Sequence, residues 1–168
     1  LYQGKDDYIG GAGIVAQHLN AAGADVTFST VLGKDDLAKF VIDGLKEAGI
    51  KINAITDETR PTTNKNAIIA GGYRLLKVDT LDNRSISEGI LEQLTSKIEG
   101  TETDAVVFSD FRHGIFNHWT VPQLTDAIPA VGATSPSSKT STSSRPTSAR
   151  PVSRWVIRTP LSAHLPAH

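Results

Sequence analysis

Apolar residues recur at the spacings of helices and strands along the first part of the chain. Helical spacing over 14–22 and 37–48 predicts two amphipathic helices, each followed by a glycine. The β-branched and aromatic run at 26–32 predicts a strand, and the alternating residues at 50–55 predict a shorter one. Helices that alternate with apolar strands favour an α/β layered fold.

A hairpin and two more helices are predicted further along. Two apolar runs within 66–78 flank Gly71-Gly72, which favours a β-hairpin appended to the layered fold. An S-x-x-E pattern at 85–88 predicts a capping box that opens a helix, and a T-x-x-Q pattern at 120–123 predicts the start of another. The first of these helices has an apolar stripe of Ile86, Ile90, Leu91, Leu94 and Ile98.

Four consecutive apolar residues at 105–108 predict a strand that is buried on both faces. A polar stretch follows it at once, with Asp110, Arg112, His113 and then Gly114. In open α/β sheets the chemistry lies beyond the carboxyl ends of such strands, so these side chains are candidates for a functional loop. An ordinary polar turn after a strand would have the same composition.

Charge and composition change near residue 128. All 18 acidic residues lie at or before Asp126, whereas five of the 17 Lys and Arg and six of the eight prolines lie after it. Residues 129–168 have no helical stripe, and their Ser/Pro/Arg-rich composition predicts disorder. We therefore expect a folded domain at 1–128 and a disordered tail at 129–168.

Several classes of protein are disfavoured by composition. The absence of cysteine excludes a disulfide framework and thiolate metal sites. The histidines show no metal-ligand spacing, and we expect no metal held by protein side chains alone. No apolar run approaches the roughly 20 residues that span a membrane, and no signal-peptide pattern is present, so a cytoplasmic protein is expected.

Gly10 and Gly11 precede the first predicted helix and are candidates for binding a ligand through the backbone. Glycines at a helix start let an anion or a hydroxyl approach free amides. Residues 11–16 also fit G-x-G-x-x-A, but the buried strand that this dinucleotide fingerprint requires does not precede them. A tight turn into a helix would need glycine as well, and it stays open as the alternative.

Lys65, Arg74 and Lys77 lie on or beside the predicted hairpin. Cations at this density suit a phosphate or a sugar phosphate. A solvated strand face is the alternative, and Asp79 or Asp82 would cancel the positive charge by pairing with these residues.

Five motifs follow one another along residues 10–114: GGAGIVAQHLNAAGADVTF, VLGKDD, RPTTNKNAII, YRLLKVD and DAVVFSDFRHG. Their order resembles the ribokinase-like (PfkB) carbohydrate kinases, nearest to the branch that phosphorylates heptose 7-phosphate in ADP-heptose synthesis. The resemblance covers residues 9–128. It implies a partial three-layer α/β/α sandwich with a small β lid at 60–80.

The resemblance also implies roles for individual residues. Gly10 and Gly11 would line the sugar site, Lys65 and Lys77 would lie on the lid near the substrate phosphate, and Asp110 would face the cleft. Three further substrate-binding candidates are Arg74, Arg112 and His113. The chain departs from the family at several positions, which indicates a divergent subfamily: Ile14 replaces a substrate-contacting Asn, Arg112-His113 replaces Gly-Lys, and Asn66 and Lys77 alter the lid pattern.

Two motifs of the family are absent from these 168 residues. One is N-x-x-E, which organises Mg²⁺ and phosphate, and the other is G-A-G-D, which carries the anion hole and the catalytic base. We therefore expect no catalytic residue in this chain, no productive binding of ATP and Mg²⁺, and no kinase turnover from it alone. One hypothesis is that residues from about 130 onward are a frameshifted reading. Back-translation of 139–160, read from the third codon base, can spell Asn-Glu-Arg-Glu. A natural basic tail is the competing interpretation.

The resemblance thus implies ATP-dependent phosphorylation of a sugar or sugar phosphate, with a small-molecule sugar phosphate as partner. Neither nucleic acid nor membrane is expected as a partner. Members of the family often dimerise through the lid, and this hairpin is a candidate for the same contact. The alternatives are a non-catalytic fragment that binds a sugar phosphate and a truncated product with no function of its own.

Overall fold

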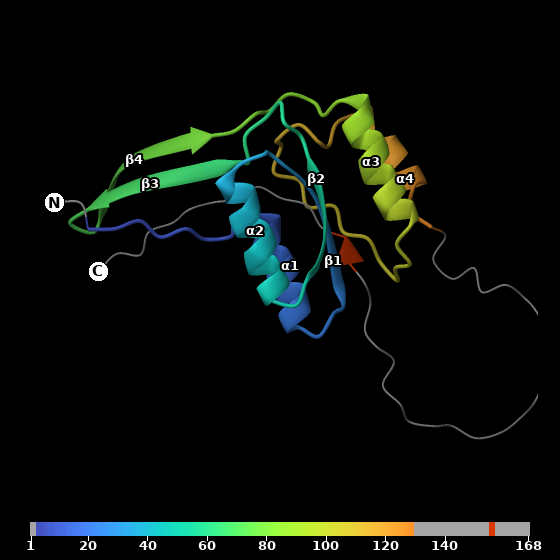
Figure 1. Ribbon diagram of the computed structural model, residues 1–168, viewed down its shortest axis with the longest axis horizontal. Coiled ribbons are helices and arrows are strands. Elements are labelled where there is room, and N and C mark those ends of the chain that lie inside the picture. The colour runs from blue at the N-terminus through green and yellow to red at the C-terminus, as the bar shows by residue number, and fades with distance from the viewer. Residues whose placement is uncertain (1–2, 130–154, 157–168) are drawn as a thin grey trace, which may run out of the picture.

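The computed structural model describes residues 3–129 and the backbone of residues 155–156 (Figure 1). Its centre is a parallel sheet with the strand order β2-β1-β5. The central strand β1 (Val26–Leu32) pairs with β2 (Lys51–Thr56) over most of its length, and β5 (Trp155–Val156) pairs with Val26 and Thr27 at its start.

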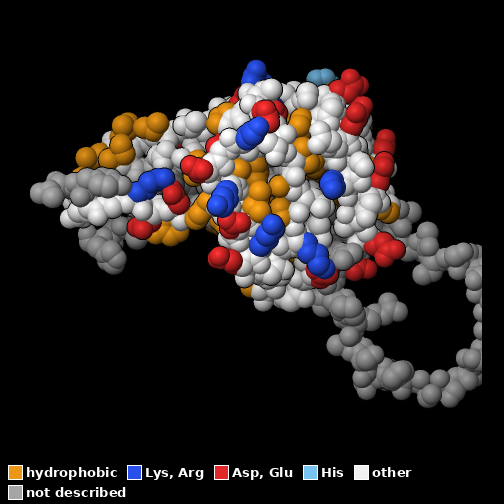
Figure 2. Space-filling view, viewed as in Figure 1, with side chains coloured by type: hydrophobic (Ala, Val, Ile, Leu, Met, Phe, Trp, Pro, Cys, Tyr) orange, Lys and Arg blue, Asp and Glu red, His pale blue; other side chains and the backbone are white. Residues whose placement is uncertain are grey.

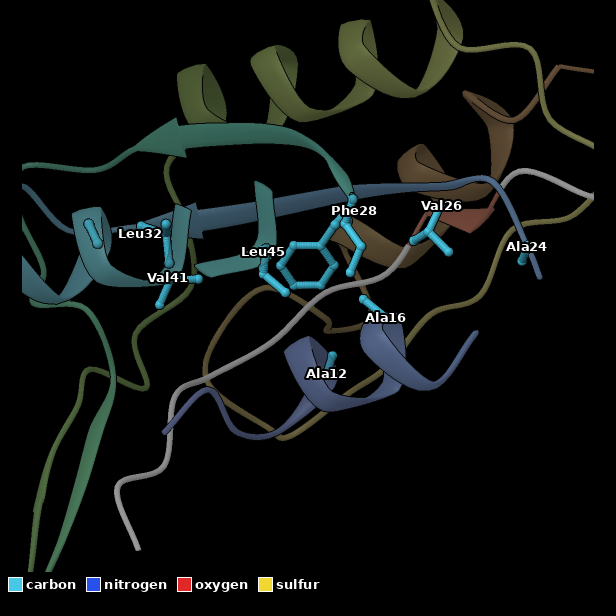
Figure 3. Packing of buried hydrophobic residues seen from close by; sticks show 10 residues of the cluster. Ala12, Ala16, Ala24, Val26, Phe28, Leu32, Val41 and Leu45 are labelled. Atoms are coloured by element: carbon cyan, nitrogen blue, oxygen red, sulfur yellow. The ribbon is translucent and has the colours of Figure 1, made fainter. Parts of the chain in front are cut away.

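Two helices cover each face of this sheet (Figure 1). They are α1 (Ala12–Ala21) and α2 (Asp36–Glu47) on one face, and α3 (Glu88–Glu99) and α4 (Thr120–Asp126) on the other. Because side chains alternate along a strand, β1 contributes Phe28 to the first core and Val31 to the second. Figure 3 shows the first core, where Phe28 and Leu45 are both buried. The predicted α/β layering is therefore confirmed.

The predicted hairpin is also present. Strands β3 (Asn64–Ala70) and β4 (Tyr73–Thr80) pair in antiparallel fashion around Gly71 and Gly72, which both have positive φ. All residues of β4 are exposed, and the hairpin projects away from the layered body (Figure 1). Contacts at its base must therefore determine how it is oriented.

The start of α3 differs from the prediction. Its N-cap is Ser87, whose side chain accepts from the Ile90 amide at 3.4 Å, so the capping box at Ser85 is wrong. Ser85 Oγ instead accepts from Asn117 Nδ2 at 3.1 Å, a tertiary contact that the local pattern does not encode. The apolar stripe is confirmed, since its five members are all buried.

The predicted strand at 105–108 is wrong as well. This segment is neither helix nor strand, and Phe108 is exposed. Its valines still reach both faces of the sheet, since Val106 packs against the second core and Val107 against the first. The segment forms no ladder with β1, which pairs with β2 along one edge and with β5 only at Val26 and Thr27 on the other.

The predicted disorder of the tail lies outside the described residues, apart from 155–156, which form β5 instead. No helix within the described part of the chain has the length and apolar character needed to cross a bilayer.

Candidate functional site

The glycine segment forms a tight entrance to α1. Gly10 is buried, and Gly11 has φ 57° and occupies the N-cap without a side-chain cap. The Gly13 amide is already used, because it donates to the Gly10 carbonyl at 3.1 Å. A Cβ on Gly13 would lie 2.4 Å from Ile9 Cγ2, so this glycine is needed for packing. The turn accounts for glycine at position 11, and the packing accounts for glycine at position 13. The ligand-binding role of Gly10 and Gly11 stays a prediction.

The three hairpin cations share one face. Lys65 pairs with Asp79 across the ladder and Lys77 pairs with Ala67, which places both lysines on the same side. A register shift after Ile68 brings Arg74 opposite Ile69, on that side too. The bulge therefore turns Arg74 toward the lysines, a placement that simple alternation would not give.

Their charges are only partly neutralised. Lys77 Nζ lies 3.0 Å from Asp79 Oδ2, whereas Asp82 pairs with Arg84 and not with the hairpin cations. Among the residues that the structure describes, Lys65 and Arg74 make no ion pair with an acid. The cation face thus keeps a net positive charge, as a phosphate site requires.

The loop after residue 108 folds back on itself. Asp110 Oδ1 accepts from the Arg112 amide at 2.7 Å, and Arg112 has a left-handed backbone with φ 59°. Both side chains are exposed. Asp110 therefore closes a local turn, and its role toward a substrate stays a prediction.

His113 and Gly114 dock this loop onto the connection between β4 and α3. His113 Nδ1 lies 2.8 Å from Asn83 Oδ1, and the Gly114 carbonyl accepts from the Ile86 amide at 3.0 Å. Gly114 has φ 82°, and a Cβ there would lie 1.9 Å from the Arg84 carbonyl oxygen. Glycine is thus required by backbone conformation and by close approach at once.

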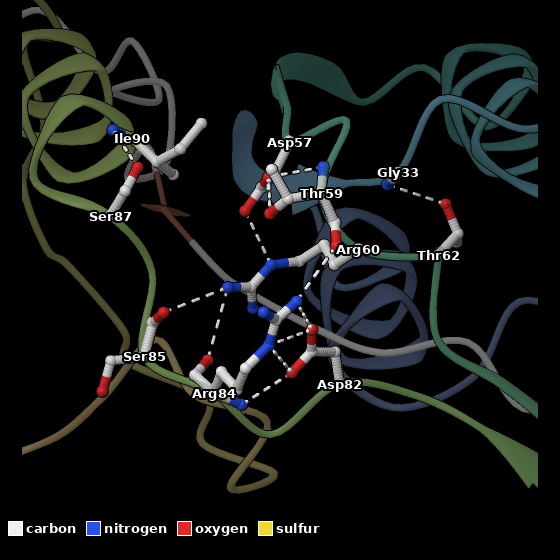
Figure 4. A network of polar contacts seen from close by, with 10 residues as sticks. All are labelled: Gly33, Asp57, Thr59, Arg60, Thr62, Asp82, Arg84, Ser85, Ser87 and Ile90. Atoms are coloured by element: carbon white, nitrogen blue, oxygen red, sulfur yellow. Dashed lines mark hydrogen bonds and ion pairs between the residues drawn. The ribbon is translucent and has the colours of Figure 1, made fainter.

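A polar network that the sequence did not predict lies at the base of the hairpin (Figure 4). Arg60 Nε donates to Asp57 Oδ2 at 2.7 Å, and the two side chains are only 8% and 6% exposed. A buried charge is costly unless it is paired with an opposite charge. An acid followed three residues later by an arginine is the one local sequence feature that could have indicated this buried pair.

Hydrogen bonds lower the pKa values of two carboxyl groups in this network. Burial raises the pKa of Asp57, but donation from the Thr59 hydroxyl, the Thr59 amide and Arg60 outweighs it, so the pKa lies below its usual value. The side-chain hydrogen bond from Arg84 lowers the pKa of Asp82 to about 2. Both carboxylates therefore stay ionised at lower pH than an ordinary carboxylate does.

The structure brings some of the predicted residues together and leaves others apart. The 110–114 loop and the base of the hairpin meet at residues 82–86. Within the described residues, no hydrogen bond or ion pair joins the hairpin cations to Gly10 or Gly11. Figure 2 shows Lys and Arg side chains over the base of the hairpin and the adjoining body, with apolar side chains along the hairpin.

Residues 6–98 match the pfkB family carbohydrate kinase model. The bifunctional protein HldE of Caulobacter vibrioides is 33% identical over 127 residues, which are 74% of this chain and 26% of that protein. The D-beta-D-heptose 7-phosphate kinase of Bordetella bronchiseptica is 31% identical over 121 residues, covering 67% of this chain and 36% of that enzyme. The chain therefore spans about a quarter to a third of the length of these relatives.

A solved structure of ribokinase from Giardia lamblia matches with a TM-score of 0.51 and 16% identity. The match covers 68% of this chain and 37% of the ribokinase chain. At this identity the likeness shows a ribokinase-like fold and nothing more.

Proposed function

The chain belongs to the pfkB family of carbohydrate kinases, and on this basis we propose that it derives from an enzyme that transfers phosphate from ATP to a sugar phosphate, with a heptose 7-phosphate as substrate. The observation that carries the choice of a phosphorylated sugar is the cation face of the hairpin. Lys65, Arg74 and Lys77 share that face, and Asp79 pairs with only one of them. A neutral sugar would not require such a surplus of charge.

In this proposal the hairpin is the lid over the sugar. Gly10 and Gly11 approach the sugar through their backbone, and the three cations bind its phosphate. Asp110, Arg112 and His113 lie on the loop that completes the cleft. Each of these roles rests on the family and on the placement of the residues on the lid, the α1 entrance and the 110–114 loop.

The chemistry of phosphoryl transfer is proposed to lie outside these 168 residues. ATP and a divalent metal serve the family in general, but the described residues contain no group of three or more His, Asp or Glu that could hold a metal. The absence of G-x-G-D from the sequence favours the second candidate function, binding of a sugar phosphate without turnover.

Equilibrium binding of heptose 7-phosphate to the full chain tests this proposal. We expect saturable binding that Lys65→Ala with Lys77→Ala weakens by about a hundredfold or more, since each of the two charge-assisted contacts to phosphate contributes roughly 1.5–3 kcal/mol. Lys39→Ala, an exposed lysine on α2, is the matched control and should leave binding unchanged. Equal affinity for the unphosphorylated heptose would contradict the phosphate assignment. ATP consumption that Asp110→Asn abolishes would contradict the proposal of binding without turnover.

Two further proposals concern the tail and the cellular location of the protein. Residues from about 130 onward are proposed to be an out-of-frame reading, which sequencing of the coding DNA from the codon of Thr120 onward would test. A second frame that gives Asn-Glu-Arg-Glu and then Gly-Ala-Gly-Asp is expected, and its absence would favour a natural tail. A cytoplasmic location is the one that ATP-dependent sugar phosphorylation implies.

Dimerisation through the hairpin is proposed from its other face. The ladder pairs Ile68 with Leu76 and Asn66 with Val78, so Ile68, Leu76 and Val78 point away from the cations. All three are exposed, as is Tyr73, which lies on the same side. An apolar face of this kind on a projecting hairpin suits contact with a second copy.

A further inference from the structure

Two arginines join the chain segments that enter and leave the hairpin. The incoming connection is residues 57–63 and the outgoing connection is residues 81–87. Arg60 Nη2, on the incoming side, donates to the carbonyls of Arg84 at 3.3 Å and Ser85 at 3.2 Å. Arg84 Nη2, on the outgoing side, donates to the Thr59 carbonyl at 3.1 Å (Figure 4). Each guanidinium thus binds the backbone of the opposite connection, and we call Arg60 and Arg84 the arginine clasp.

Carboxylates on each side hold the two head groups in place. Asp57 Oδ2 accepts from Arg60 Nε at 2.7 Å, while Asp57 Oδ1 accepts from the Thr59 amide and hydroxyl. Asp82 accepts from Arg84 Nε at 2.8 Å. A guanidinium fixed in this way has few rotamers to lose when it binds a carbonyl, so the clasp is preorganised.

The outgoing connection also receives the loop that carries Asp110. Gly114 lies so close to the Arg84 carbonyl that it leaves no room for a Cβ. The same carbonyl accepts from Arg60, so the loop and the clasp meet at one peptide group. Two hydrogen bonds also join the outgoing connection to the loop. The Ile86 amide donates to the Gly114 carbonyl, and Asn83 Oδ1 bonds with His113 Nδ1.

We propose that the arginine clasp is a positioning device that couples the orientation of the hairpin to the position of the 110–114 loop. Because every residue of β4 is exposed, contacts at the base of the hairpin orient it, and these include the clasp and the hydrogen bond from the Thr62 amide to Asp35. The clasp and the 110–114 loop both contact the outgoing connection. A shift of residues 83–86 therefore moves the cation face and Asp110 together. The link to a sugar phosphate rests on the proposed function, but the coupling itself does not.

An arginine clasp that only stabilised the fold would behave differently. It would lower the free energy of unfolding when removed, yet leave the hairpin at the same angle in the folded state. A positioning device changes the orientation of the hairpin while the body stays folded, so the measurement must report geometry as well as stability.

The absence of cysteine allows such a measurement on the full chain. Spin labels on Tyr73→Cys, at the hairpin end, and on Lys39→Cys, on α2, report the distance between hairpin and body. Arg84→Gln removes the donation to Thr59 from an exposed side chain, so the variant should fold. Arg60→Lys keeps a cation beside Asp57 but cannot reach the Arg84 and Ser85 carbonyls at the same time.

Both substitutions are expected to shift or broaden the distance distribution. They are also expected to speed hydrogen exchange of amides in 64–80 and 110–114 by about fivefold, the ratio that the loss of one hydrogen bond gives. Glu58→Gln is the matched control, because Glu58 pairs with Lys34 in an exposed ion pair (68% and 71% exposed) that does not reach the outgoing connection. It should change neither readout.

An unchanged distance distribution in both arginine variants would overturn the coupling, even if both variants were less stable. Faster exchange in 64–80 without any change in 110–114 would overturn it as well. Repeating the distance measurement with heptose 7-phosphate separates the two proposals. If the unmodified chain does not bind this probe, the proposed function fails, and the effect of the arginine variants still decides the clasp.

Discussion

The Asp35 carboxylate ties the start of helix α2 to Thr62 at the base of the hairpin. Its Oδ1 accepts from the Ala38 amide at 2.9 Å, and its Oδ2 accepts from the Thr62 amide at 2.8 Å. Thr62 Oγ1 accepts in turn from the Gly33 amide at 3.0 Å. One side chain therefore caps a helix of the body and also binds the chain where it enters the hairpin.

Asp35→Ala is expected to lower the free energy of unfolding by about 2 kcal/mol. A lost N-cap costs about 1 kcal/mol, and the amide of Thr62 loses a second hydrogen bond of similar value. Asp35→Asn keeps one acceptor oxygen and should cost about half as much. Urea unfolding of the full chain measures both.

The neighbouring Asp36 supplies the control for this prediction. It lies in the first turn of α2 and is exposed, so Asp36→Ala should change the free energy of unfolding by no more than about 0.5 kcal/mol. Equal losses for Asp35→Ala and Asp36→Ala would mean that helix-dipole charge, and not the bridge to Thr62, accounts for the effect.

Stability is expected to fall in acid because three carboxylates have lowered pKa values. Burial raises the pKa of Asp35, but the Thr62 and Ala38 donors outweigh it, and Asp57 behaves in the same way. Arg84 lowers the pKa of Asp82 from 3.8 to about 2. The unfolded chain therefore takes up protons first, and the free energy of unfolding decreases as pH falls below the unfolded value toward about 2.

Urea unfolding at several pH values between about 5 and about 3 checks this sign. Asp82→Asn should reduce the slope of stability against pH, because it removes one of the three groups. A slope that is unchanged in this variant, or a chain that becomes more stable in acid, would rule out the assigned shift of Asp82.

Gly114→Ala is expected to cost roughly 2–4 kcal/mol of unfolding free energy. The residue has φ 82°, which strains any side chain, and its Cβ would lie 1.9 Å from the Arg84 carbonyl oxygen. Gly89→Ala is the matched control, because a Cβ at this position of α3 meets nothing within 4 Å. It should stabilise the chain by about 0.5–1 kcal/mol through helix propensity. A loss at Gly114 no larger than about 0.5 kcal/mol would show that the loop does not pack on Arg84.

Periodic segments of this chain could be predicted from sequence, and contacts between distant segments could not. The apolar stripes at 14–22 and 37–48 and the strand at 26–32 correspond to α1, α2 and β1, since local burial requirements determine such patterns. The Gly71-Gly72 turn fixed the hairpin in the same way. The arginine clasp joins residues 24 and 25 positions apart, and no periodicity reports such a pair.

The two failed predictions have a common cause. The segment at 105–108 has the composition of a buried strand, but a strand also needs a ladder with a neighbouring strand, and this segment forms none with β1. Ser85 and Ser87 both precede Glu88, and the tertiary contact with Asn117 engages the first of them. The composition of a segment indicates which secondary structures it can form. Its contacts with neighbouring segments determine which of these is stable.

The ladder places the hairpin cations on one face and Ile68, Leu76 and Val78 on the other, so the two faces can be tested separately. Val78 lies on the apolar face opposite Asn66 and is 44% exposed. If this face meets a second copy, Val78→Lys should shift the chain toward monomer, because two lysines would be brought together in an apolar contact. Sedimentation velocity over a range of concentrations measures this shift.

Val121 on α4 provides a matched valine, with 38% exposure at a position away from the hairpin. Val121→Lys should leave the oligomeric state unchanged. Because Lys65 and Lys77 lie on the opposite face, Val78→Lys should also leave heptose 7-phosphate binding intact. A monomeric unmodified chain at every concentration would exclude the hairpin contact, whereas a dimer that both valine variants disrupt equally would place the contact elsewhere.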